Sequence, residues 1–432
     1  MTKPLRIALA GLGTVGSGVI RLINANGSMI AQNAGRPISV VAISARDRNR
    51  DRGVDLSPYK WVDDMDEFAA DPEIDCVVEV IGGSDGPALN LARNSLKQGK
   101  SFVTANKAMI AHHGMELAGL AESKGVALKY EAAVAGGIPV IKGLRDGASA
   151  NRIERVYGIL NGTCNYILAT MEKHGSDFDA VLKDAQDLGY AEADPSFDID
   201  GVDAAHKLAI LAALSFGTAV DFDGVEISGI RNIMAADIGQ AKALGYRIRL
   251  LGMARIDGEK LFQRVNPYLV PENHPLAHIE GSTNAVVAEG NFSGRLMFQG
   301  AGAGDGPTAS AVVADLIDIA RGDCGSVFTM SADQMTERER AESGNRTGKS
   351  YIRFVVTDKP GVLAEITAAM RDAEVSIESL IQTEKTDEGS VLISMVTHQS
   401  KERDVIQSLQ KLSDSSSLQG APVVMHLLSD ED

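Results

Sequence analysis

Three acids and one amine lie close together near the middle of the chain, in an arrangement typical of an active site. Glu192 and Asp194 precede Asp203, which stands four residues before Lys207. The pattern from residue 202 to 216 is helical, so the side chains of Asp203 and Lys207 share one face about a turn apart. A structural ion pair is the alternative interpretation of these two residues.

The helix that carries this pair is expected to be buried. Residues 208–214 are all apolar and leave almost no polar face. Lys207 therefore stands where solvation is poor, so it must be paired or have a pKa below the usual value of about 10.4. A lysine in that state can donate or accept a proton during catalysis.

A glycine motif near the N-terminus predicts a dinucleotide site, because it follows a buried strand and opens a helix from Thr14 to Ile23. Gly11 permits the tight turn, Gly13 lets the backbone approach a pyrophosphate, and Gly16 allows close helix packing. The N-terminal end of the helix favours phosphate. The candidate cofactor-binding residues of this motif are Gly11, Gly13, Thr14, Val15 and Gly16.

The next strand indicates which dinucleotide is bound. The acid expected about 20 residues after the motif is absent, because residues 24–37 lengthen the loop before the strand 38–44. That strand leads into Arg46, and an arginine at its tip suits a 2′-phosphate. NADP(H) is therefore favoured over NAD(H), and a solvated charged run from 46 to 52 is the alternative.

Length and composition exclude several classes of protein. At 432 residues the chain predicts two or three domains. A net charge of −16 argues against nonspecific binding to nucleic acid or to an anionic membrane, and the longest apolar segment is too short to span a bilayer. Three scattered cysteines and the lack of a signal peptide favour the cytoplasm.

The order of elements predicts an α/β protein with several parts. Strands and helices alternate through the first part, which indicates a doubly wound parallel sheet. Gly11, Gly82-Gly83 and Asn106-Lys107 all follow strands and should cluster at one edge. A second region begins near Gly136, and the glycine-rich segment 300–308 opens another helix.

Residues 350–432 predict a small independent domain, because they repeat the order βαββαβ. The loop 358–363 places free backbone N–H groups where a small carboxylate could bind. An oligomerisation module is the alternative.

The charged segment 333–349 is predicted to be a linker across which few contacts run. The expected elements are strands 351–356, 377–384, 390–397 and 423–428 and helices 360–372 and 401–412.

Seven segments together closely resemble homoserine dehydrogenase of the longer kind, which ends in an ACT domain, and the resemblance covers essentially the whole chain. These segments are residues 11–16, 104–107, 131–139, 161–163, 189–207, 300–308 and 358–363. The resemblance implies reversible reduction of L-aspartate 4-semialdehyde to L-homoserine by NAD(P)H, a step towards threonine and methionine. It also implies a homodimer or homotetramer and threonine as the usual feedback effector.

The resemblance implies a fold with three parts: a Rossmann-type doubly wound parallel sheet, an α+β substrate and dimerisation domain, and a ferredoxin-like βαββαβ ACT domain. The expected boundaries are residues 1–135 with a return helix at about 305–330, residues 136–304, a linker at 331–349, and residues 350–432.

The resemblance also assigns roles to site residues. Glu192 and Asp203 would bind the α-ammonium group of the substrate, and Asp198 is a candidate for the same shell. Lys207 would donate a proton to the aldehyde oxygen as hydride reaches the carbon. The resemblance also implies that Lys107 is a second lysine near the nicotinamide and the substrate. Spacing does not settle which lysine is the acid, and the family pattern favours Lys207.

Two further sites follow from the resemblance alone. By this resemblance, Gly189 and Gly304 are expected to contact the cofactor through their backbone. In the family, a monovalent cation, usually sodium, is held largely through carbonyls by the segment matching Glu131, Val134, Gly136 and Ile138.

Two other functions stay open. In a cysteine-dependent semialdehyde dehydrogenase, Cys164 would attack the aldehyde, but that chemistry would not explain the Asp203 and Lys207 pair. A nucleotide and amino-acid sensor without turnover would not need a buried amine beside its ligand. Lys207 therefore discriminates between the enzyme and the sensor.

Overall fold

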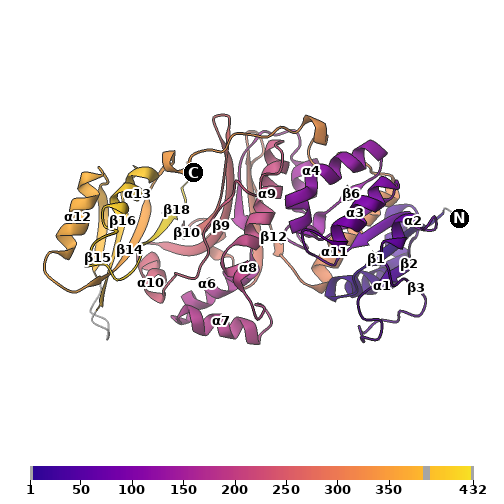
Figure 1. Ribbon diagram of the computed structural model, residues 1–432, viewed down its shortest axis with the longest axis horizontal. Coiled ribbons are helices and arrows are strands. Elements are labelled where there is room, and N and C mark those ends of the chain that lie inside the picture. The colour runs from indigo at the N-terminus through magenta and orange to yellow at the C-terminus, as the bar shows by residue number, and fades with distance from the viewer. Residues whose placement is uncertain (1–2, 383–389, 430–432) are drawn as a thin grey trace.

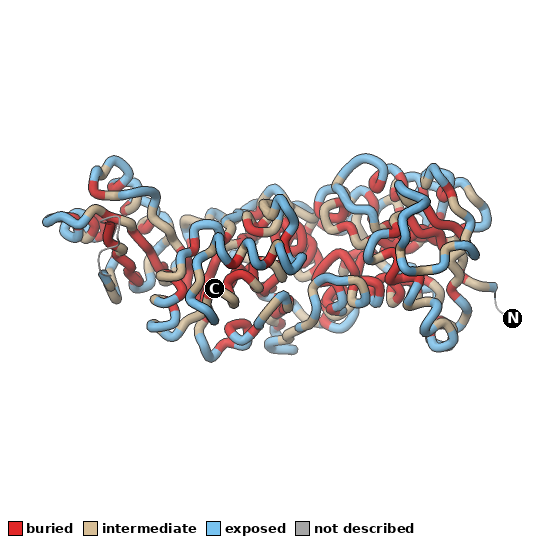
Figure 2. Tube along the Cα trace, turned by 90° about the horizontal axis from the view of Figure 1, so that it is seen from below, coloured by how far each residue is buried: buried red, intermediate tan, exposed pale blue. Residues whose placement is uncertain are grey.

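The computed structural model describes residues 3–382 and 390–429. Figure 1 shows three parts in a row, from the N-terminal domain in indigo through a middle domain to the C-terminal domain in yellow. Figure 2 shows buried residues running through all three parts. No helix within the described ranges is long and apolar enough to cross a membrane.

The first part is built on a six-stranded sheet in the order β3-β2-β1-β4-β5-β6. All neighbouring strands are parallel, which confirms the doubly wound parallel sheet. The central strands are continuous buried runs, as a parallel sheet covered on both faces requires. The strands are β1 (Leu5–Ala10), β2 (Ile38–Ser44), β3 (Lys60–Trp61), β4 (Cys76–Glu79), β5 (Ser101–Thr104) and β6 (Leu128–Lys129).

Helices from two distant parts of the sequence cover this sheet (Figure 1). Helix α11 (Asp305–Arg321) packs along α1 (Thr14–Ala34), and its apolar face joins the core that contains Leu9 and Ile20. The chain therefore returns to its first sheet after building the middle domain. The other helices of this part are α2 (Glu67–Ala70), α3 (Pro87–Lys97) and α4 (Lys107–Lys124).

Helix α1 is longer than its sequence pattern predicts. The helix was expected to end at Ile23, but it continues past a kink at Asn26 to Ala34. Ile30 and Ala34 are buried against the core, so tertiary packing holds the second half helical. Gly35 ends the helix in a left-handed conformation with φ 74°.

The middle and C-terminal parts share one ten-stranded sheet in the order β12-β11-β7-β9-β10-β18-β14-β16-β15, with β8 beside β10. The middle strands are β7 (Ile153–Ile159), β8 (Glu226–Ile227), β9 (Tyr246–Asp257), β10 (Lys260–Pro271), β11 (Thr283–Gly290) and β12 (Gly294–Ala301). The C-terminal strands are β14 (Ser350–Thr357), β15 (Ile377–Gln382), β16 (Ser390–Thr397) and β18 (Val423–Leu427). A separate pair joins β13 (Thr347–Gly348) to β17 (Ser400–Lys401).

Helix α9 (Val202–Phe216) carries Asp203 and Lys207 and is buried along most of its length. It packs against β7, β9 and β10 on one side and against α4 on the other. Every residue from Asp203 to Leu214 is buried, which confirms the prediction from its apolar sequence. The remaining helices of this part are α5 (Val140–Lys142), α6 (Gly162–His174), α7 (Phe178–Asp187), α8 (Ser196–Ile199) and α10 (Ala235–Ala243).

The C-terminal domain has the predicted order βαββαβ, with α12 (Val362–Asp372) and α13 (Glu402–Gln410) as its helices. Helix α12 begins two residues later than expected, after Gly361 with φ 99°. The expected strand 377–384 reaches Gln382 in the described residues, and residues 383–384 lie outside them, as do 430–432.

The expectation that few contacts cross into the C-terminal domain is wrong. Strand β18 lies parallel to β10, with Tyr268 opposite His426, and antiparallel to β14. Two ion pairs cross the same boundary, Arg353 with Asp237 at 2.8 Å and Arg264 with Glu402 at 2.8 Å. Strand β18 therefore joins the two domains, a contact that the local sequence pattern does not reveal.

The segment expected as a linker is also held in place. Thr336 forms a backbone bridge with Thr218, just after the end of α9, and Arg340 forms one with Leu261. The guanidinium of Arg340 donates to Asp221 at 2.8 Å. The segment therefore follows the surface of the middle domain on its way to β14.

Replacing Arg353 by methionine should lower the free energy of unfolding by about 3–5 kcal/mol, because it leaves the Asp237 carboxylate buried without a countercharge. The side chains are 3% and 0% exposed. Urea denaturation followed by circular dichroism measures the change. Arg371→Met removes an exposed ion pair with Asp372 and should cost less than about 1 kcal/mol. Equal losses in the two variants would show that the buried pair does not hold the domains together.

Candidate active site

The glycine motif forms the turn between β1 and α1 as its spacing predicts. Gly11 has φ 101°, and a Cβ there would lie 2.7 Å from the carbonyl oxygen of Val80. A Cβ on Gly16 would lie 2.0 Å from the carbonyl oxygen of Gly11, whereas Gly13 faces open space. No side chain caps α1 at Gly13, so the first N–H groups of the helix are available to a phosphate.

Arginines gather at the tip of β2, beside this turn. Arg46 is exposed after the strand, and the guanidinium groups of Arg48 and Arg52 lie 5.6 and 5.9 Å from the ring centroid of Trp61. Nε of Arg52 donates to the carbonyl oxygen of Leu12 at 2.9 Å. Sequence reasoning selected Arg46 alone, although Arg52 belongs to the same charged run and contacts the glycine motif.

Asp203 joins two lysines from different domains. Nζ of Lys207 donates to Oδ2 of Asp203 at 2.7 Å and to the carbonyl oxygen of Leu160 at 2.7 Å. Nζ of Lys107, at the start of α4, lies 3.0 Å from Oδ1 of Asp203. Lys207 and Asp203 are 8% and 4% exposed. The structure therefore brings together the candidate proton donors that spacing alone could not connect.

The two lysines keep Asp203 ionised. Burial raises the pKa of the Asp203 carboxyl, but the nearby charges of Lys207 and Lys107 and its hydrogen bonds outweigh burial. The net pKa lies well below its usual range. Asp203 therefore holds a fixed negative charge that orients both ammonium groups.

Asp198 lies in the same polar cluster. Nδ2 of Asn161 donates to Oδ1 of Asp198 at 2.8 Å and to Oδ2 of Asp203 at 2.8 Å. The hydroxyl of Thr163 donates to the other Asp198 oxygen at 3.3 Å. Burial, followed by the charge of Asp203, raises the pKa of the Asp198 carboxyl. Sequence reasoning did not give Asn161 a role, although its motif was among the matching segments.

Glu192 does not contact this cluster. Its side chain is exposed in the loop between α7 and α8, and its backbone carbonyl accepts from Nε2 of Gln186 at 3.0 Å. Within residues 3–382 and 390–429, its carboxylate forms no ion pair or hydrogen bond.

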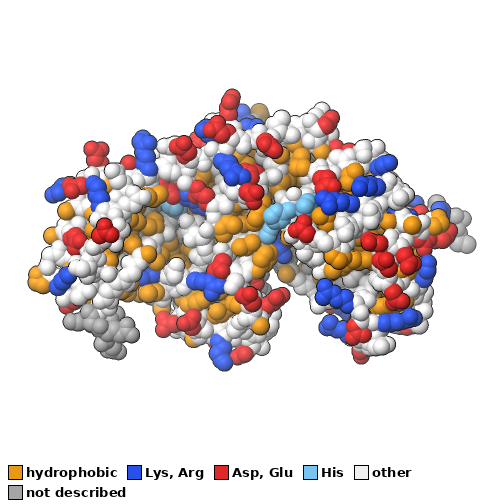
Figure 3. Space-filling model, viewed as in Figure 1, with side chains coloured by type: hydrophobic (Ala, Val, Ile, Leu, Met, Phe, Trp, Pro, Cys, Tyr) orange, Lys and Arg blue, Asp and Glu red, His pale blue; other side chains and the backbone are white. Residues whose placement is uncertain are grey.

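An aromatic stack lies beside Lys107. The ring of Phe197 lies 5.6 Å from Nζ of Lys107 and 5.6 Å from the ring of His206, which stacks on Phe222 at 4.2 Å. Nε2 of His206 lies 3.2 Å from Nε2 of His112 on α4. Burial, followed by the charges of His112 and Lys107, lowers the pKa of His206 to about 4. Figure 3 shows histidine side chains where the first and middle domains meet.

Gly304 and Gly189 lie in turns with left-handed backbone. Gly304 has φ 120° and directly precedes α11, where Asp305 pairs with Arg21 of α1. The cofactor motif and the glycine-rich segment therefore lie side by side. Gly189, with φ 76°, follows α7 and has open space around it.

The candidate cation loop is strained and closely packed. Ala135 and Gly136 have φ 56° and 49°, a conformation that costs an alanine free energy unless the surroundings hold it. A Cβ on Gly136 would lie 2.5 Å from the carbonyl oxygen of Gly302. The loop contains Glu131, Val134, Gly136 and Ile138.

Backbone carbonyls are the oxygens that this loop could offer to a cation. The Glu131 carboxylate accepts from the N–H groups of Ile141 and Lys142, both at 2.9 Å, and is occupied there. No group of three or more His, Cys, Asp or Glu side chains among the described residues could hold a metal. Carbonyl oxygens along the loop would be the ligands of a monovalent cation, since hard cations prefer oxygen.

The position of Cys164 argues against thiol chemistry. Its side chain is fully buried, and its thiol donates to the carbonyl oxygen of Asp198 at 3.2 Å. Burial and the charge of Asp198 raise the pKa of the thiol well above its usual value. Because the thiolate is the nucleophile, Cys164 is poorly suited to attack a carbonyl carbon.

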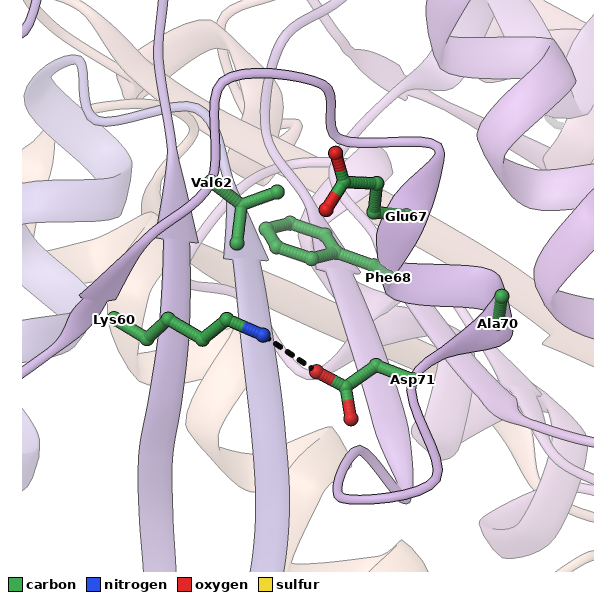
Figure 4. Close-up of a pocket in the computed structure, with 6 residues that line it drawn as sticks. All are labelled: Lys60, Val62, Glu67, Phe68, Ala70 and Asp71. Carbon is green, nitrogen blue, oxygen red and sulfur yellow. Dashed lines mark hydrogen bonds and ion pairs between the residues drawn. The ribbon is translucent and has the colours of Figure 1, made fainter.

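A shallow pocket on the first domain lies apart from these residues. Figure 4 shows it at the outer edge strand β3 and the helix α2. Its only charged contact in the view joins Lys60 and Asp71 at 3.0 Å. The pocket contains none of the residues that the sequence singled out.

Comparison with known proteins identifies matches along nearly the whole chain. A model for the homoserine dehydrogenase NAD binding domain matches residues 11–131, one for homoserine dehydrogenase matches 139–317, and one for the ACT domain matches 350–414. The chain is 42% identical to homoserine dehydrogenase of Pseudomonas aeruginosa, covering 98% of each chain. It is 38% identical to that of Bacillus subtilis, covering 95% of each.

Solved structures agree with these matches. The crystal structure of a homoserine dehydrogenase from Thiobacillus denitrificans has a TM-score of 0.92 and 41% identity, with 99% of each chain covered. A hyperthermophilic archaeal homoserine dehydrogenase in complex with NADPH has a TM-score of 0.62 and 28% identity, covering 73% of this chain and 97% of the other.

Proposed function

The chain belongs to the homoserine dehydrogenase family, and on that premise we propose that it interconverts L-aspartate 4-semialdehyde and L-homoserine on the way to threonine and methionine. It is an NAD(P)-dependent oxidoreductase acting on CH–OH groups. One observation supports the proposed chemistry most directly: the Asp203 carboxylate binds Lys207 and Lys107 where α9 meets α4.

Lys207 is the proposed proton donor. The bound dinucleotide supplies the hydride. As the carbonyl carbon is reduced, Nζ of Lys207 protonates its oxygen, and the reverse reaction returns that proton. Its hydrogen bonds to Asp203 and the Leu160 carbonyl aim the ammonium group, and its burial excludes water that would compete. Lys107 is more exposed, at 31% of its side chain, and is proposed to orient the substrate oxygen.

Three carboxylates are proposed to receive the substrate ammonium group: Glu192, Asp203 and Asp198. Both oxygens of Asp203 already bind lysines, so Asp198 is the better electrostatic partner of a further cation. Burial disfavours its ionised form, and a bound ammonium would reverse that effect. Glu192 is proposed to complete the shell from its exposed loop.

NADP(H) is the proposed cofactor in preference to NAD(H). The exposed Arg46 and the neighbouring Arg48 and Arg52 form a cationic tip beside the glycine motif, and a 2′-phosphate carries the charge that such a tip would attract. The backbone contacts are proposed at Gly11, Gly13, Thr14, Val15, Gly16, Gly189 and Gly304, with Lys107 beside the reacting end.

A monovalent cation, with sodium as the first candidate, is proposed at the loop containing Glu131, Val134, Gly136 and Ile138. The left-handed turn at Ala135 and Gly136 supports this proposal. The cation would hold the loop next to the Gly302 turn and would take no part in proton transfer.

Feedback regulation by threonine is proposed for the C-terminal domain, and a homodimer or homotetramer is the proposed assembly. The loop 358–363 leads into α12 through Gly361, and the backbone N–H groups at that helix start can bind a carboxylate. Inhibition requires the effector to bind two states of the enzyme unequally.

Replacing Lys207 by alanine should lower kcat by about 10²- to 10⁴-fold, as expected for loss of a placed proton donor. The dissociation constant for NADPH should change by less than about twofold. Steady-state kinetics with homoserine and a fluorescence titration measure the two quantities. Lys173→Ala, at an exposed lysine on α6, is the matched control and should keep full activity. Near-normal kcat in Lys207→Ala, with loss in Lys107→Ala, would move the role to Lys107.

Replacing Arg46 by alanine should raise KM for NADPH about tenfold, because it removes one charge-assisted contact to a phosphate. KM for NADH should stay within about twofold. Arg50→Ala, in the same exposed run, controls for general electrostatic attraction. Equal effects of Arg46→Ala on both cofactors would show that Arg46 belongs to a solvated charged run and does not bind the 2′-phosphate.

Replacing Gly361 by valine should raise the threonine concentration for half-inhibition about tenfold, because a side chain at φ 99° forces the loop out of its conformation. Turnover without threonine should stay within about twofold. Gly258→Val places similar strain in a turn of the middle domain and should leave inhibition unchanged. Undiminished threonine sensitivity in Gly361→Val would exclude this loop as the effector site.

A further inference from the structure

A buried acid lies at the carboxyl end of β4, outside the set of residues assigned above. Glu79 is 0% exposed and pairs in register with Thr104, also 0% exposed, at the end of β5. A carboxylate in such a place is costly unless its oxygens receive hydrogen bonds. The sequence offers one signal for it, an acid ending the apolar strand Cys76–Glu79.

The Glu79 carboxylate holds the loop that follows its own strand. Oε1 accepts from the N–H groups of Ile81 at 2.6 Å and Gly82 at 2.9 Å. Gly82 and Gly83 have φ 92° and 90°, a backbone region that glycine enters without strain. The hydrogen bonds select one conformation from the many open to two successive glycines.

The same carboxylate reaches the neighbouring loop through Thr104. The Thr104 hydroxyl donates to Oε2 of Glu79 at 2.5 Å and accepts from the N–H of Asn106 at 2.9 Å. Nδ2 of Asn106 donates back to the carbonyl oxygen of Gly83 at 2.6 Å. These contacts form a closed ring of hydrogen bonds between the two loops, which we call the Glu79 ring (Glu79, Ile81 to Gly83, Thr104 and Asn106).

The Glu79 ring lies between the cofactor motif and the catalytic lysines. On one side, Val80 donates to the Ala10 carbonyl at 2.9 Å, next to Gly11. On the other, Oδ1 of Asn106 caps α4 by accepting from Met109 N at 3.1 Å, and Lys107 is the first residue of that helix. The ring therefore fixes the spacing between the dinucleotide turn and Lys107.

We propose that Glu79 and Thr104 are positioning residues for hydride transfer, which hold the Ile81–Gly83 loop and the first turn of α4 as one rigid unit. The proposal rests on the proposed roles of Lys107, Asp203 and Lys207. A loop of two glycines without this restraint loses conformational entropy when the cofactor binds. The ring removes that cost before binding.

Thr104→Val tests the proposal, because valine has the shape of threonine but neither donates to Glu79 nor accepts from Asn106. We expect the dissociation constant for NADPH to rise about tenfold and kcat with homoserine to fall about tenfold. Thr104→Ser keeps the hydroxyl and should bring both values to within about threefold of the unaltered enzyme. The full-length protein is used, with fluorescence titration, steady-state kinetics and thermal unfolding without ligand.

Two further variants separate positioning from stability. Ser95→Ala removes a buried hydroxyl of the same domain that has no hydrogen-bond partner among the described residues, and it should leave NADPH binding and kcat unchanged. Asn106→Ser keeps a side chain that can cap α4 but is too short to reach Gly83. It should weaken NADPH binding about tenfold while α4 stays folded, so the proposal is tested even if Thr104→Val does not fold.

Unchanged NADPH binding and kcat in Asn106→Ser or in a folded Thr104→Val would overturn the proposal. A loss in Thr104→Ser equal to that in Thr104→Val would overturn it as well, since the hydroxyl would then be irrelevant. Failure of the proposed function gives a different result, because the unaltered enzyme would then be inactive on homoserine. The NADPH titrations, which need no homoserine, would still report on the ring.

Discussion

The Asp203 carboxylate couples the first domain to the middle domain at the candidate active site. Its two oxygens bind Lys207 on its own helix and Lys107 on a helix of the first domain. A buried charge is tolerated only when it is paired, and Lys207 on the same helix already supplies one countercharge to Asp203. The packing of α9 against α4 adds Lys107 as a second countercharge, so the whole cluster of candidate groups forms only where the two domains meet.

The surrounding elements hold the Asp203 cluster and the cofactor motif in place. Helix α11 returns from the middle domain to pack on α1, which ties the glycine-rich segment at Gly304 to the cofactor motif. The Glu79 ring fixes the loops after β4 and β5. The stacked His206 and Phe222 fill the space beside α4 with neutral groups. Helices α4 and α9 thus carry the charged groups, while the turns at Gly11 and Gly304 are the proposed cofactor contacts.

The C-terminal domain is joined to the middle domain by backbone pairing. Because β18 lies between β10 and β14, one sheet runs from the proposed effector domain to the strands beneath α9. The buried pair of Arg353 and Asp237 fixes that junction. A shift of the C-terminal domain would move β10 and helix α9, which packs on it. Regulation could act through this junction if the junction has two arrangements.

Local sequence patterns were enough to predict the order of the elements, the glycine turn at Gly11 and the burial of α9 with Asp203 beside Lys207. Each of these depends on periodicity or on contacts a turn apart, which local sequence encodes. Only long-range packing brings Lys107 to Asp203, keeps α1 helical past Asn26 and pairs β18 with β10. Those outcomes depend on packing between residues far apart in the chain, where the free energy of burial and charge pairing overrides local preference.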